Sequence, residues 1–398
     1  MKIYIDVSMI MIGTKFTGIP RVVMELVKRF SKEEKIEVVP VEYDVKKDKY
    51  RIIDSAKFAE FCSTKSGNRN KLRTNDLIAF DEFEEGSIFF DSDTVWKTRV
   101  KRSFLYPVLK EKRVNIVPFI HDIIPIEFPE FCGMDDVINF VDFTGAVLNY
   151  SDRILVSTNT TKNSIEALAE SLKTTAPEID IVTFGGEFKK FLSNKKDTSN
   201  AGDENETTNV SDVVKEIAEA GKYLIMVGTI EPRKNHKVLL DAYENMLKDD
   251  INLVIAGYVG QGMEDLISRI ENNPNNRKGL WRIESANDEE IDYLYRHAYA
   301  LSFSSYAEGF GLPLIEAMVR RVPIIASDTP INHEVAGDKA VYFGKDDWKE
   351  LGDTVLHLLK NEDEYKALVE KTKDYIPPTW EDTAEGVIRV FENVCSGK

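Results

Sequence analysis

The stretch ALSFSSYAEGFGLPLIEAMVRRVPIIASDTPINHEVAGDKAVYF, residues 300–343, decides the fold and carries the strongest functional signal. It opens with a small-to-apolar run that is typical of a short buried strand. A turn follows with Gly309 and Gly311, which let the backbone approach a ligand closely. Pro313 is placed to be the first residue of a helix, where its missing N–H costs little. Such a turn presents free amides and a positive dipole end to an anion, typically a phosphate.

Two carboxylates bracket this turn: Glu308 comes before it, and Glu316 falls in the first turns of the expected helix. An ionised carboxylate at Glu316 can accept hydrogen bonds from both hydroxyls of a ribose, and Glu308 can accept them from a sugar beside the phosphates. A solvated surface pair is the alternative, because glutamate is common at helix starts. The glycines, the proline and both acids together favour a ligand site.

The segment E-G-F-G-L-P-x-x-E, residues 308–316, resembles the E-x7-E signature of retaining GT-B glycosyltransferases of family 4, the glycosyl transferases group 1. The resemblance continues through PIIASD at 323–328 and EVAG at 334–337. It implies an α/β protein with the GT-B fold, in which two Rossmann-like domains face each other across a cleft. The nucleotide-sugar is then expected on the C-terminal domain and the acceptor on the N-terminal domain. It also implies a retaining hexosyltransferase that needs no metal and no cofactor.

A second signal lies upstream, where an apolar run at 223–227 suits a parallel strand and is followed by GTIEPRKN at 228–235. Arg233 and Lys234 suit a diphosphate, since arginine offers a planar fork of donors and lysine a point charge. Solvated basic residues at a helix start are the alternative. Cations are unfavourable at a helix N-terminus, however, so a bound anion helps to explain them. E-P-R-K-N resembles the diphosphate-binding segment of the family.

The N-terminal half opens with a strand at 2–7, a loop with Gly18 and a helical pattern, which together are typical of a nucleotide-binding α/β unit. A full G-x-G-x-x-G is missing, so a dinucleotide cofactor is weakly supported. The resemblance implies that the Gly18 loop lies over the donor diphosphate and the acceptor; a plain turn glycine is the alternative. His121 and Asp122 follow another expected strand. The resemblance places His121 near the anomeric carbon, chiefly through its backbone carbonyl, and Asp122 on the acceptor side.

Two further patterns have competing interpretations. Asp91-Ser92-Asp93 is similar to a D-x-D metal motif, which we discount because so short a match occurs by chance. Residues 97–113 hold seven basic residues and one acid in an otherwise acidic chain. This segment could lie on an anionic membrane face. The alternative, slightly favoured, is a surface helix that packs its apolar stripe inward.

Composition limits the remaining classes. A chain of 398 residues with 42% hydrophobic content is expected to form two domains or slightly more. The formal charge of −16 argues against nucleic-acid binding. The three cysteines form no metal or redox motif, and no apolar run reaches the roughly 18 residues of a membrane span. A soluble, cytoplasmic protein is expected, at the inner face of the cell membrane if residues 97–113 bind lipid.

The predicted domains are 1–188 for the acceptor, a flexible polar linker at 189–212, 213–375 for the nucleotide-sugar, and a C-terminal helix at 376–398 that crosses back to the first domain. Other expected elements are a strand at 179–184, a helix at 291–298 and a charged helical region at 349–373. Residues 43–90 match the family least.

The predicted function is transfer of a sugar, first of all mannose, from a nucleotide-sugar to a growing, lipid-linked bacterial surface polysaccharide. A GT-B sugar-nucleotide epimerase and a non-catalytic nucleotide-sugar-binding protein are the alternatives. The predicted partners are therefore a nucleotide-sugar donor and a glycan or lipid-linked glycan acceptor, without nucleic acid. The candidate site residues are His121, Arg233, Lys234 and Glu308 for catalysis, Gly18, Ile283, Glu308, Gly309, Phe310, Gly311, Leu312 and Glu316 for the donor, and Asp122 for the acceptor side.

Overall fold

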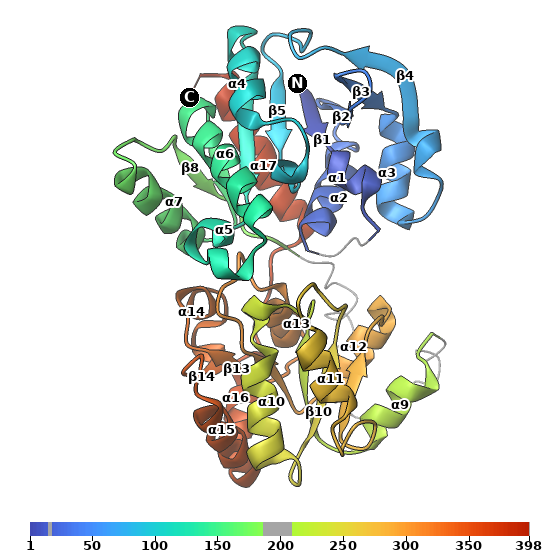
Figure 1. The fold of residues 1–398 in the computed structure, drawn as a ribbon, viewed down its shortest axis with the longest axis vertical. Helices are drawn as coiled ribbons and strands as arrows, with labels where there is room; N and C mark the ends of the chain where they lie inside the picture. Colours follow the sequence, from blue (N-terminus) through green and yellow to red (C-terminus); the bar gives the residue numbers. More distant parts are fainter. Residues whose placement is uncertain (15–17, 186–208, 398) are drawn as a thin grey trace. The chain divides into compact units, whose positions relative to one another are not determined.

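The computed structural model describes residues 1–14, 18–185 and 209–397. The chain divides into two units by its contacts. The first comprises Met1–Gly186 together with Pro378–Lys398, and the second Glu187–Pro377 (Figure 1). The linker predicted at 189–212 lies outside the described residues as far as residue 208.

The first unit is built on an eight-stranded sheet in the order β4-β3-β2-β1-β5-β6-β7-β8. Neighbours from β2 through β1 to β8 run parallel, and the side chains of its central strands are buried in apolar runs, as expected for a sheet covered on both faces. The strands are β1 Lys2–Asp6, β2 Glu37–Asp44, β3 Lys49–Ile53, β4 Arg73–Ile78, β5 Ile88–Asp91, β6 Asn115–Ile120, β7 Ile154–Val156 and β8 Ile179–Ile181.

The part of the chain that matched the family least adds an antiparallel edge to this sheet. β3 pairs antiparallel with β2, and β4 antiparallel with β3. A tight turn joins β2 to β3, with Asp48 in the left-handed region at φ 52°. Neither β3 nor β4 was predicted from the sequence.

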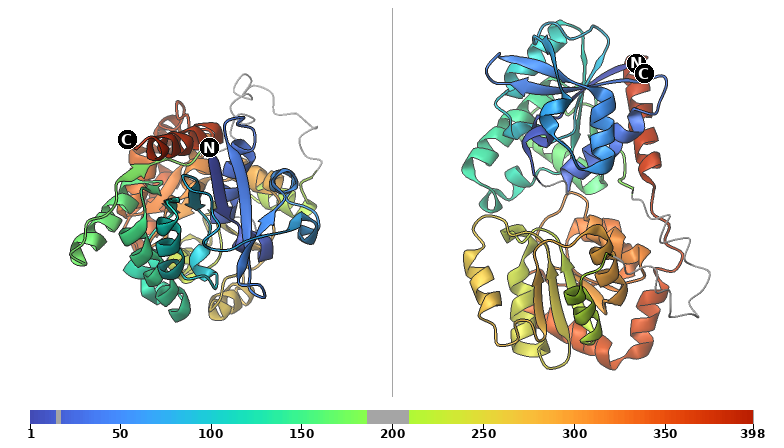
Figure 2. Two further views of the ribbon diagram at one scale, coloured as in Figure 1. Left: turned by 90° about the horizontal axis from the view of Figure 1, so that it is seen from above. Right: turned by 90° about the vertical axis from the view of Figure 1, so that its right-hand side faces the viewer.

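The helices of the first unit include one from the end of the chain, α17. Its Phe391 contacts Phe30 and Phe90, with ring centroids 5.9 and 5.1 Å away, and the Thr383 hydroxyl donates to the carbonyl of Thr183 at 3.0 Å. Figure 2 shows this helix beside the first unit's sheet. The α-helices are α1 Ser8–Ile12, α2 Ile19–Phe30, α3 Ser55–Thr64, α4 Arg102–Glu111, α5 Ile124–Glu127, α6 Met134–Tyr150, α7 Asn159–Ser171 and α17 Trp380–Cys395.

The second unit holds a six-stranded, entirely parallel sheet in the order β11-β10-β9-β12-β13-β14. Its strands are β9 Tyr223–Val227, β10 Asn252–Ala256, β11 Leu280–Ile283, β12 Ala300–Phe303, β13 Ile324–Ser327 and β14 Ala340–Phe343. Its α-helices are α9 Asp212–Glu219, α10 His236–Ala242, α11 Glu264–Glu271, α12 Asp288–His297, α13 Leu312–Val319, α14 Pro330–Ala336, α15 Trp348–Lys360 and α16 Glu362–Glu370. Both units are thus α/β with largely parallel sheets, as the sequence predicted.

Several predicted bounds were wrong for local reasons. Pro313 is the second residue of α13, because Gly311 is the N-cap. α12 begins three residues before 291, since Asn287 and Glu290 form a capping box. The helical region at 349–373 is two helices separated at Asn361. The strand expected at 179–184 is only three residues long.

The basic segment 97–113 contains α4, and its apolar stripe faces the core. Leu105, Tyr106 and Leu109 are fully buried. Arg102, at the first position of α4, is also buried and donates to Asp6 at 2.6 Å and to Asp91 at 2.6 and 2.9 Å. The segment therefore packs as an ordinary amphipathic helix. Across the described part of the chain, we find no helix with the length and apolar character needed to cross a membrane.

Candidate functional site

The basic couple and the glycine-rich turn follow two neighbouring strands. Arg233 and Lys234 lie in a single 3₁₀ turn, Pro232–Lys234, after β9, and Glu308 lies in the turn after β12. Because β9 and β12 pair in parallel, both segments leave the sheet at the same edge. Ligands of open α/β sheets bind outside the carboxyl ends of the strands. The topology therefore brings the two sequence signals together.

Glu308 and the two cations form a buried ion-pair cluster. Arg233 Nη1 donates to Glu308 Oε2 at 2.8 Å, and Lys234 Nζ contacts Glu308 Oε1. The side chains of Glu308 and Lys234 are only 6% and 9% exposed. Arg233 also pairs with Glu231 at 2.8 Å. The alternative in which Glu308 and Lys234 are solvated surface groups is therefore wrong. Glu231 and Glu308 together balance the charges of the two cations.

The cluster sets the charge of its members. Burial by itself would raise the pKa of Glu308, but the charges of Arg233 and Lys234 outweigh it and lower this pKa to about 2. Burial also lowers the pKa of Lys234, against the pull of Glu308. At neutral pH Glu308 is an anion, so it can only accept hydrogen bonds.

The turn that follows Glu308 has the geometry expected for close approach of a ligand. Gly311 is the N-cap of α13 with φ +85°, a conformation that side chains rarely adopt, and a Cβ there would lie 3.1 Å from Leu314 Cδ1. Leu312 is the first helical residue, and Phe310 is buried. Gly309 lies between Glu308 and Phe310 in the same turn. The amides of this turn and the N-terminus of α13 thus lie next to the ion-pair cluster in the chain.

Glu316 lies in the second turn of α13 and accepts a hydrogen bond from Tyr295 of α12 at 3.3 Å. Arg320 of the same helix donates to the Glu316 carbonyl at 2.9 Å and pairs with Asp292 at 2.6 Å. These contacts tie α13 to α12 and orient the Glu316 carboxylate. Tyr295 was not predicted as a site residue, because no local sequence pattern points to it.

Ile283 ends β11, two strands from β9 in the sheet order. Its carbonyl accepts from the amide of Gly257 at 2.8 Å. Its expected contact with a base would use other backbone groups of this strand end, and it stays a prediction.

The first unit holds the other three predicted residues. His121 follows β6 and is 7% exposed, and its Nε2 lies 2.8 Å from the carbonyl oxygen of Ser92. Because a carbonyl only accepts, the proton is on Nε2. Burial lowers the pKa of His121 to about 4, so the ring is neutral at pH 7. Its ring stacks on that of Phe119 and lies tilted against that of Phe184.

Asp122 and Gly18 have local structural roles. Asp122 Oδ1 accepts from the amide of Ile124 at 3.0 Å, at the start of α5. Gly18 is the N-cap of α2 with φ +62°, a position that favours glycine for conformational reasons alone. The roles in acceptor and donor binding stay predictions.

The Asp91-Ser92-Asp93 motif is bonded within the fold. Asp91 accepts from Arg102 and from Tyr106 at 2.8 Å. Asp93 accepts from the amides of Ile10 at 3.2 Å and Thr94 at 2.7 Å. Among the described residues, no group of three or more histidine, cysteine or acidic side chains could hold a metal ion.

Comparison with known proteins supports a transferase domain in the second unit. Residues 207–375 match the family Glycosyl transferases group 1. The serotype-specific mannosyltransferase WbdA of Escherichia coli is 28% identical over 278 residues, which cover 68% of this chain and 32% of that protein. The O-antigen chain mannosyltransferase RfbU of Salmonella typhimurium is 33% identical over 147 residues, 36% of this chain and 40% of the relative. The chain spans about a third of the length of WbdA.

Solved structures share the fold across the whole chain. A glycosyltransferase from Rickettsia africae has a TM-score of 0.64 at 10% identity and covers 100% of this chain and 99% of its own. Anabaena Alr3699/HepE in complex with UDP and glucose has a TM-score of 0.61 at 13% identity, with 100% and 98% covered. The fold is therefore GT-B, as predicted. Both sequence signals, at 231–235 and 308–316, fall in the Glycosyl transferases group 1 domain.

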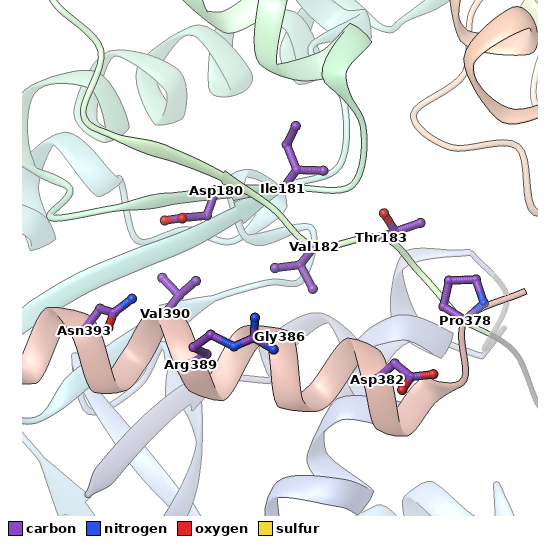
Figure 3. A pocket seen from close by; sticks show the side chains of 10 residues that line it. All are labelled: Asp180, Ile181, Val182, Thr183, Pro378, Asp382, Gly386, Arg389, Val390 and Asn393. Carbon is purple, nitrogen blue, oxygen red and sulfur yellow. The ribbon is translucent and has the colours of Figure 1, made fainter.

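One groove of the first unit lies apart from all predicted site residues. It has a volume of about 290 Å³ and runs between β8 and α17 (Figure 3). Gly386 allows α17 to approach the strand, because a Cβ there would lie 3.1 Å from Val182 Cγ1. Arg389 and Asn393 lie on the helix side of this groove. None of its lining residues falls within residues 207–375, which match the family model.

We expect the free energy of unfolding of Asp93→Asn to increase relative to that of wild type as pH rises. Burial raises the pKa of Asp93 to about 6, so the folded state retains a proton that the unfolded chain releases near 4. The stability linked to this proton is present at low pH and lost as pH rises through 6. Asparagine keeps only one of the two amide hydrogen bonds, because Asp93 accepts them on different oxygens. The prediction therefore concerns the trend with pH: the difference in free energy of unfolding should grow by about 3 kcal/mol in total, roughly half of it above pH 5.

Urea unfolding of wild type and Asp93→Asn at pH 5, 6, 7 and 8 measures this difference. Asp135→Asn, at an exposed position of α6, is the matched control and should give no trend. A constant or shrinking difference between Asp93→Asn and wild type would contradict the prediction.

Proposed function

We propose that this chain is a retaining, family 4 hexosyltransferase that moves mannose from a nucleotide-sugar to a bacterial surface polysaccharide. The observation that carries the proposal is the buried Glu308–Arg233–Lys234 cluster at the carboxyl edge of the second sheet. Two cations, a carboxylate and a helix N-terminus at one place match the needs of a sugar joined to a diphosphate. The match of residues 207–375 to Glycosyl transferases group 1 supports the same conclusion.

The hard step in such a transfer is departure of the nucleoside diphosphate. Arg233, Lys234 and the amides of the 309–312 turn would stabilise the negative charge that grows on it. Because these groups supply the positive charge, the proposed reaction requires no metal. Glu308 would accept hydrogen bonds from the donor sugar, and Glu316 from the ribose.

Retention is the finer part of the proposal. Among the described residues assigned to the site, we find no pair of carboxylates suited to the nucleophile and acid of a retaining glycosidase. We therefore propose attack on the same face that the leaving group departs from, with the leaving phosphate accepting the proton of the acceptor hydroxyl. His121, which is neutral and held by Ser92, would present its carbonyl beside the anomeric carbon, and Asp122 would contact the acceptor. Nuclear magnetic resonance of the product tests this, because an inverted anomer would overturn it.

Mannose and the polysaccharide are proposed from the relatives. WbdA is named a serotype-specific mannosyltransferase and RfbU an O-antigen chain mannosyltransferase. The acceptor is then a growing glycan, proposed to be linked to a lipid, and the protein would act at the inner face of the cell membrane. Sedimentation with anionic vesicles tests the membrane part separately from the chemistry.

Acceptor-dependent release of nucleoside diphosphate is the decisive experiment. A thermal-shift screen across nucleotide-sugars first identifies the donor, since a ligand that binds only the native state raises the melting temperature. GDP-mannose should give the largest shift, and GDP should appear only when a glycan acceptor is added. Release of GDP without acceptor, with epimerised sugar, would indicate an epimerase. If no nucleotide-sugar raises the melting temperature, the proposed transferase activity is wrong.

We expect Glu316→Gln to weaken binding of GDP by roughly tenfold to a hundredfold, because it replaces a charge-assisted hydrogen bond of about 1.5–3 kcal/mol with a neutral one. Isothermal titration calorimetry measures this. Tyr295→Phe is the matched control, since it removes the hydroxyl that donates to Glu316 and keeps the carboxylate. An unchanged affinity in Glu316→Gln would exclude a ribose contact.

A further inference from the structure

The Glu308 turn is attached to the rest of the site by hydrogen bonds on two sides. On the β9 side, Ser304 Oγ lies 2.9 Å from the carbonyl of Lys234 and 3.0 Å from that of Asn235. The amide of Tyr306 donates to the carbonyl of Arg233 at 2.8 Å. Arg233 Nη1 donates back to the carbonyl of Ala307 at 2.8 Å. These bonds hold the turn from the β9 side only.

On the other side, the contact comes from β13 and α14. Ser327, the last residue of β13, donates from Oγ to the carbonyl of Ser305 at 2.6 Å. Asn332 of α14 donates from Nδ2 to the Ser327 carbonyl at 2.9 Å and to its Oγ at 3.1 Å. Ser327 and Asn332 are both fully buried. No solvent can replace these bonds, so their geometry is fixed by the fold.

The donor and acceptor groups fix the direction of each hydrogen bond between Asn332, Ser327 and Ser305. The Ser327 carbonyl can only accept, so the amide nitrogen of Asn332 must face it. Ser327 Oγ then receives a hydrogen bond from Asn332 and has its own proton free for the Ser305 carbonyl. Asn332 therefore orients the hydroxyl that holds the turn three residues before Glu308. Figure 1 shows α13 and α14, which contact each other, at this end of the second sheet.

We infer that Asn332 and Ser327 are positioning residues for the Glu308 turn. Through Ser305 they hold the turn against the basic couple, so that Glu308 meets Arg233 and Lys234. Asn332 belongs to the I-N-H-E-V-A-G segment, which the proposed function does not otherwise use. The inference deepens the proposed function and rests on it for its catalytic meaning, although the geometry of the turn can be tested without any substrate.

The first test uses the charge state of Glu308 in the full chain. With carbon-13-labelled glutamate, the Glu308 carboxyl signal, assigned by its loss in Glu308→Gln, should not change between pH 7 and pH 4 in wild type. In Asn332→Ala and Ser327→Ala the turn is released, and the signal should begin to titrate within this range. Ser327→Cys keeps a side chain of similar volume but offers a weaker hydrogen-bond donor. The titration of its Glu308 signal should lie between those of wild type and Ser327→Ala. Flat titrations in Asn332→Ala and Ser327→Ala would overturn the inference.

Ser302→Ala is the matched control. Ser302 lies in β12 and is fully buried, and its hydroxyl has no partner among the described residues, so its removal should leave the Glu308 titration unchanged. A change as large as that in Ser327→Ala would show a general effect of cavities in the sheet and contradict a specific role.

The second test separates this inference from the proposed function. If wild type transfers mannose, Asn332→Ala should lower kcat at least tenfold while Ser302→Ala keeps it. If wild type binds no nucleotide-sugar, the proposed function fails, and the Glu308 titration still decides the positioning role. A wild-type kcat in Asn332→Ala, with folding intact by circular dichroism, would overturn the catalytic meaning of the network.

Discussion

Glu308→Gln is expected to destabilise the ligand-free protein by about 3 kcal/mol and to abolish transfer, yet to tighten binding of a nucleoside diphosphate. In wild type the carboxylate pairs with the buried Lys234 and the partly buried Arg233, and its pKa of about 2 corresponds to a similar free energy. This contribution is present above the ordinary pKa near 4.5 and is lost as pH falls through 2. Without it, Lys234 loses its acidic partner and Arg233 keeps Glu231, so the diphosphate becomes the best partner of the two cations.

Urea unfolding with and without GDP, together with calorimetry, measures both effects. GDP should bind Glu308→Gln roughly tenfold more tightly than wild type, and should recover much of the lost stability. Glu231→Gln is the control, because Glu231 also pairs with Arg233 but is 31% exposed and should cost much less. Weaker GDP binding in Glu308→Gln would show that the basic couple does not bind the diphosphate.

Arg102→Met is expected to destabilise the first unit by about 4 kcal/mol, because it leaves two buried carboxylates, Asp6 and Asp91, without their cation. Burial already raises the pKa of Asp91 in spite of Arg102. In the variant Asp91 would lose the cation that opposes this rise and bind a proton more readily, so the loss should be smaller at pH 5 than at pH 8. Urea unfolding followed by circular dichroism at the two pH values measures it.

The double variant Arg102→Met/Asp91→Asn should be more stable than Arg102→Met alone, since it removes one unpaired charge. Arg113→Met is the surface control: its side chain is 79% exposed, and its pair with Glu85 is worth at most about 1 kcal/mol. If Arg102→Met and Arg113→Met lose equal free energies of unfolding, the buried ion pairs of Arg102 contribute no more to stability than an exposed pair does.

The parts of the candidate site that the sequence indicates most clearly lie in one continuous stretch. The turn from Glu308 to Glu316 combines glycines, a proline and acids whose local conformations are independent of distant residues. The parallel strands could be identified because continuous apolar runs are typical of strands that are buried on both faces of a sheet. Apolar runs and spacing thus sufficed for the α/β class, and the resemblance of residues 308–316 to a known family supplied the GT-B fold. The antiparallel edge formed by β3 and β4 was not predicted, because its partly exposed strands carry a weaker apolar signal.

What could not be predicted depends on partners far apart in the chain. Arg233 and Glu308 were both assigned to the site, but nothing local shows that the acid neutralises the arginine 75 residues away. Arg102 appeared to be one of seven surface cations, and its buried partner Asp6 lies 96 residues away. Asn332 shows the same limit, because a lone asparagine in a helix gives no sign of the serine that it orients.

The packing of α17 against α2 also has a consequence for synthesis on the ribosome. Phe391 completes an aromatic cluster with Phe30 and Phe90, but it is translated after the entire second unit. The second unit can therefore acquire its native structure while the first unit still exposes an apolar surface. Chaperones that recognise such surfaces on nascent chains would engage the first unit until the last helix has left the exit tunnel.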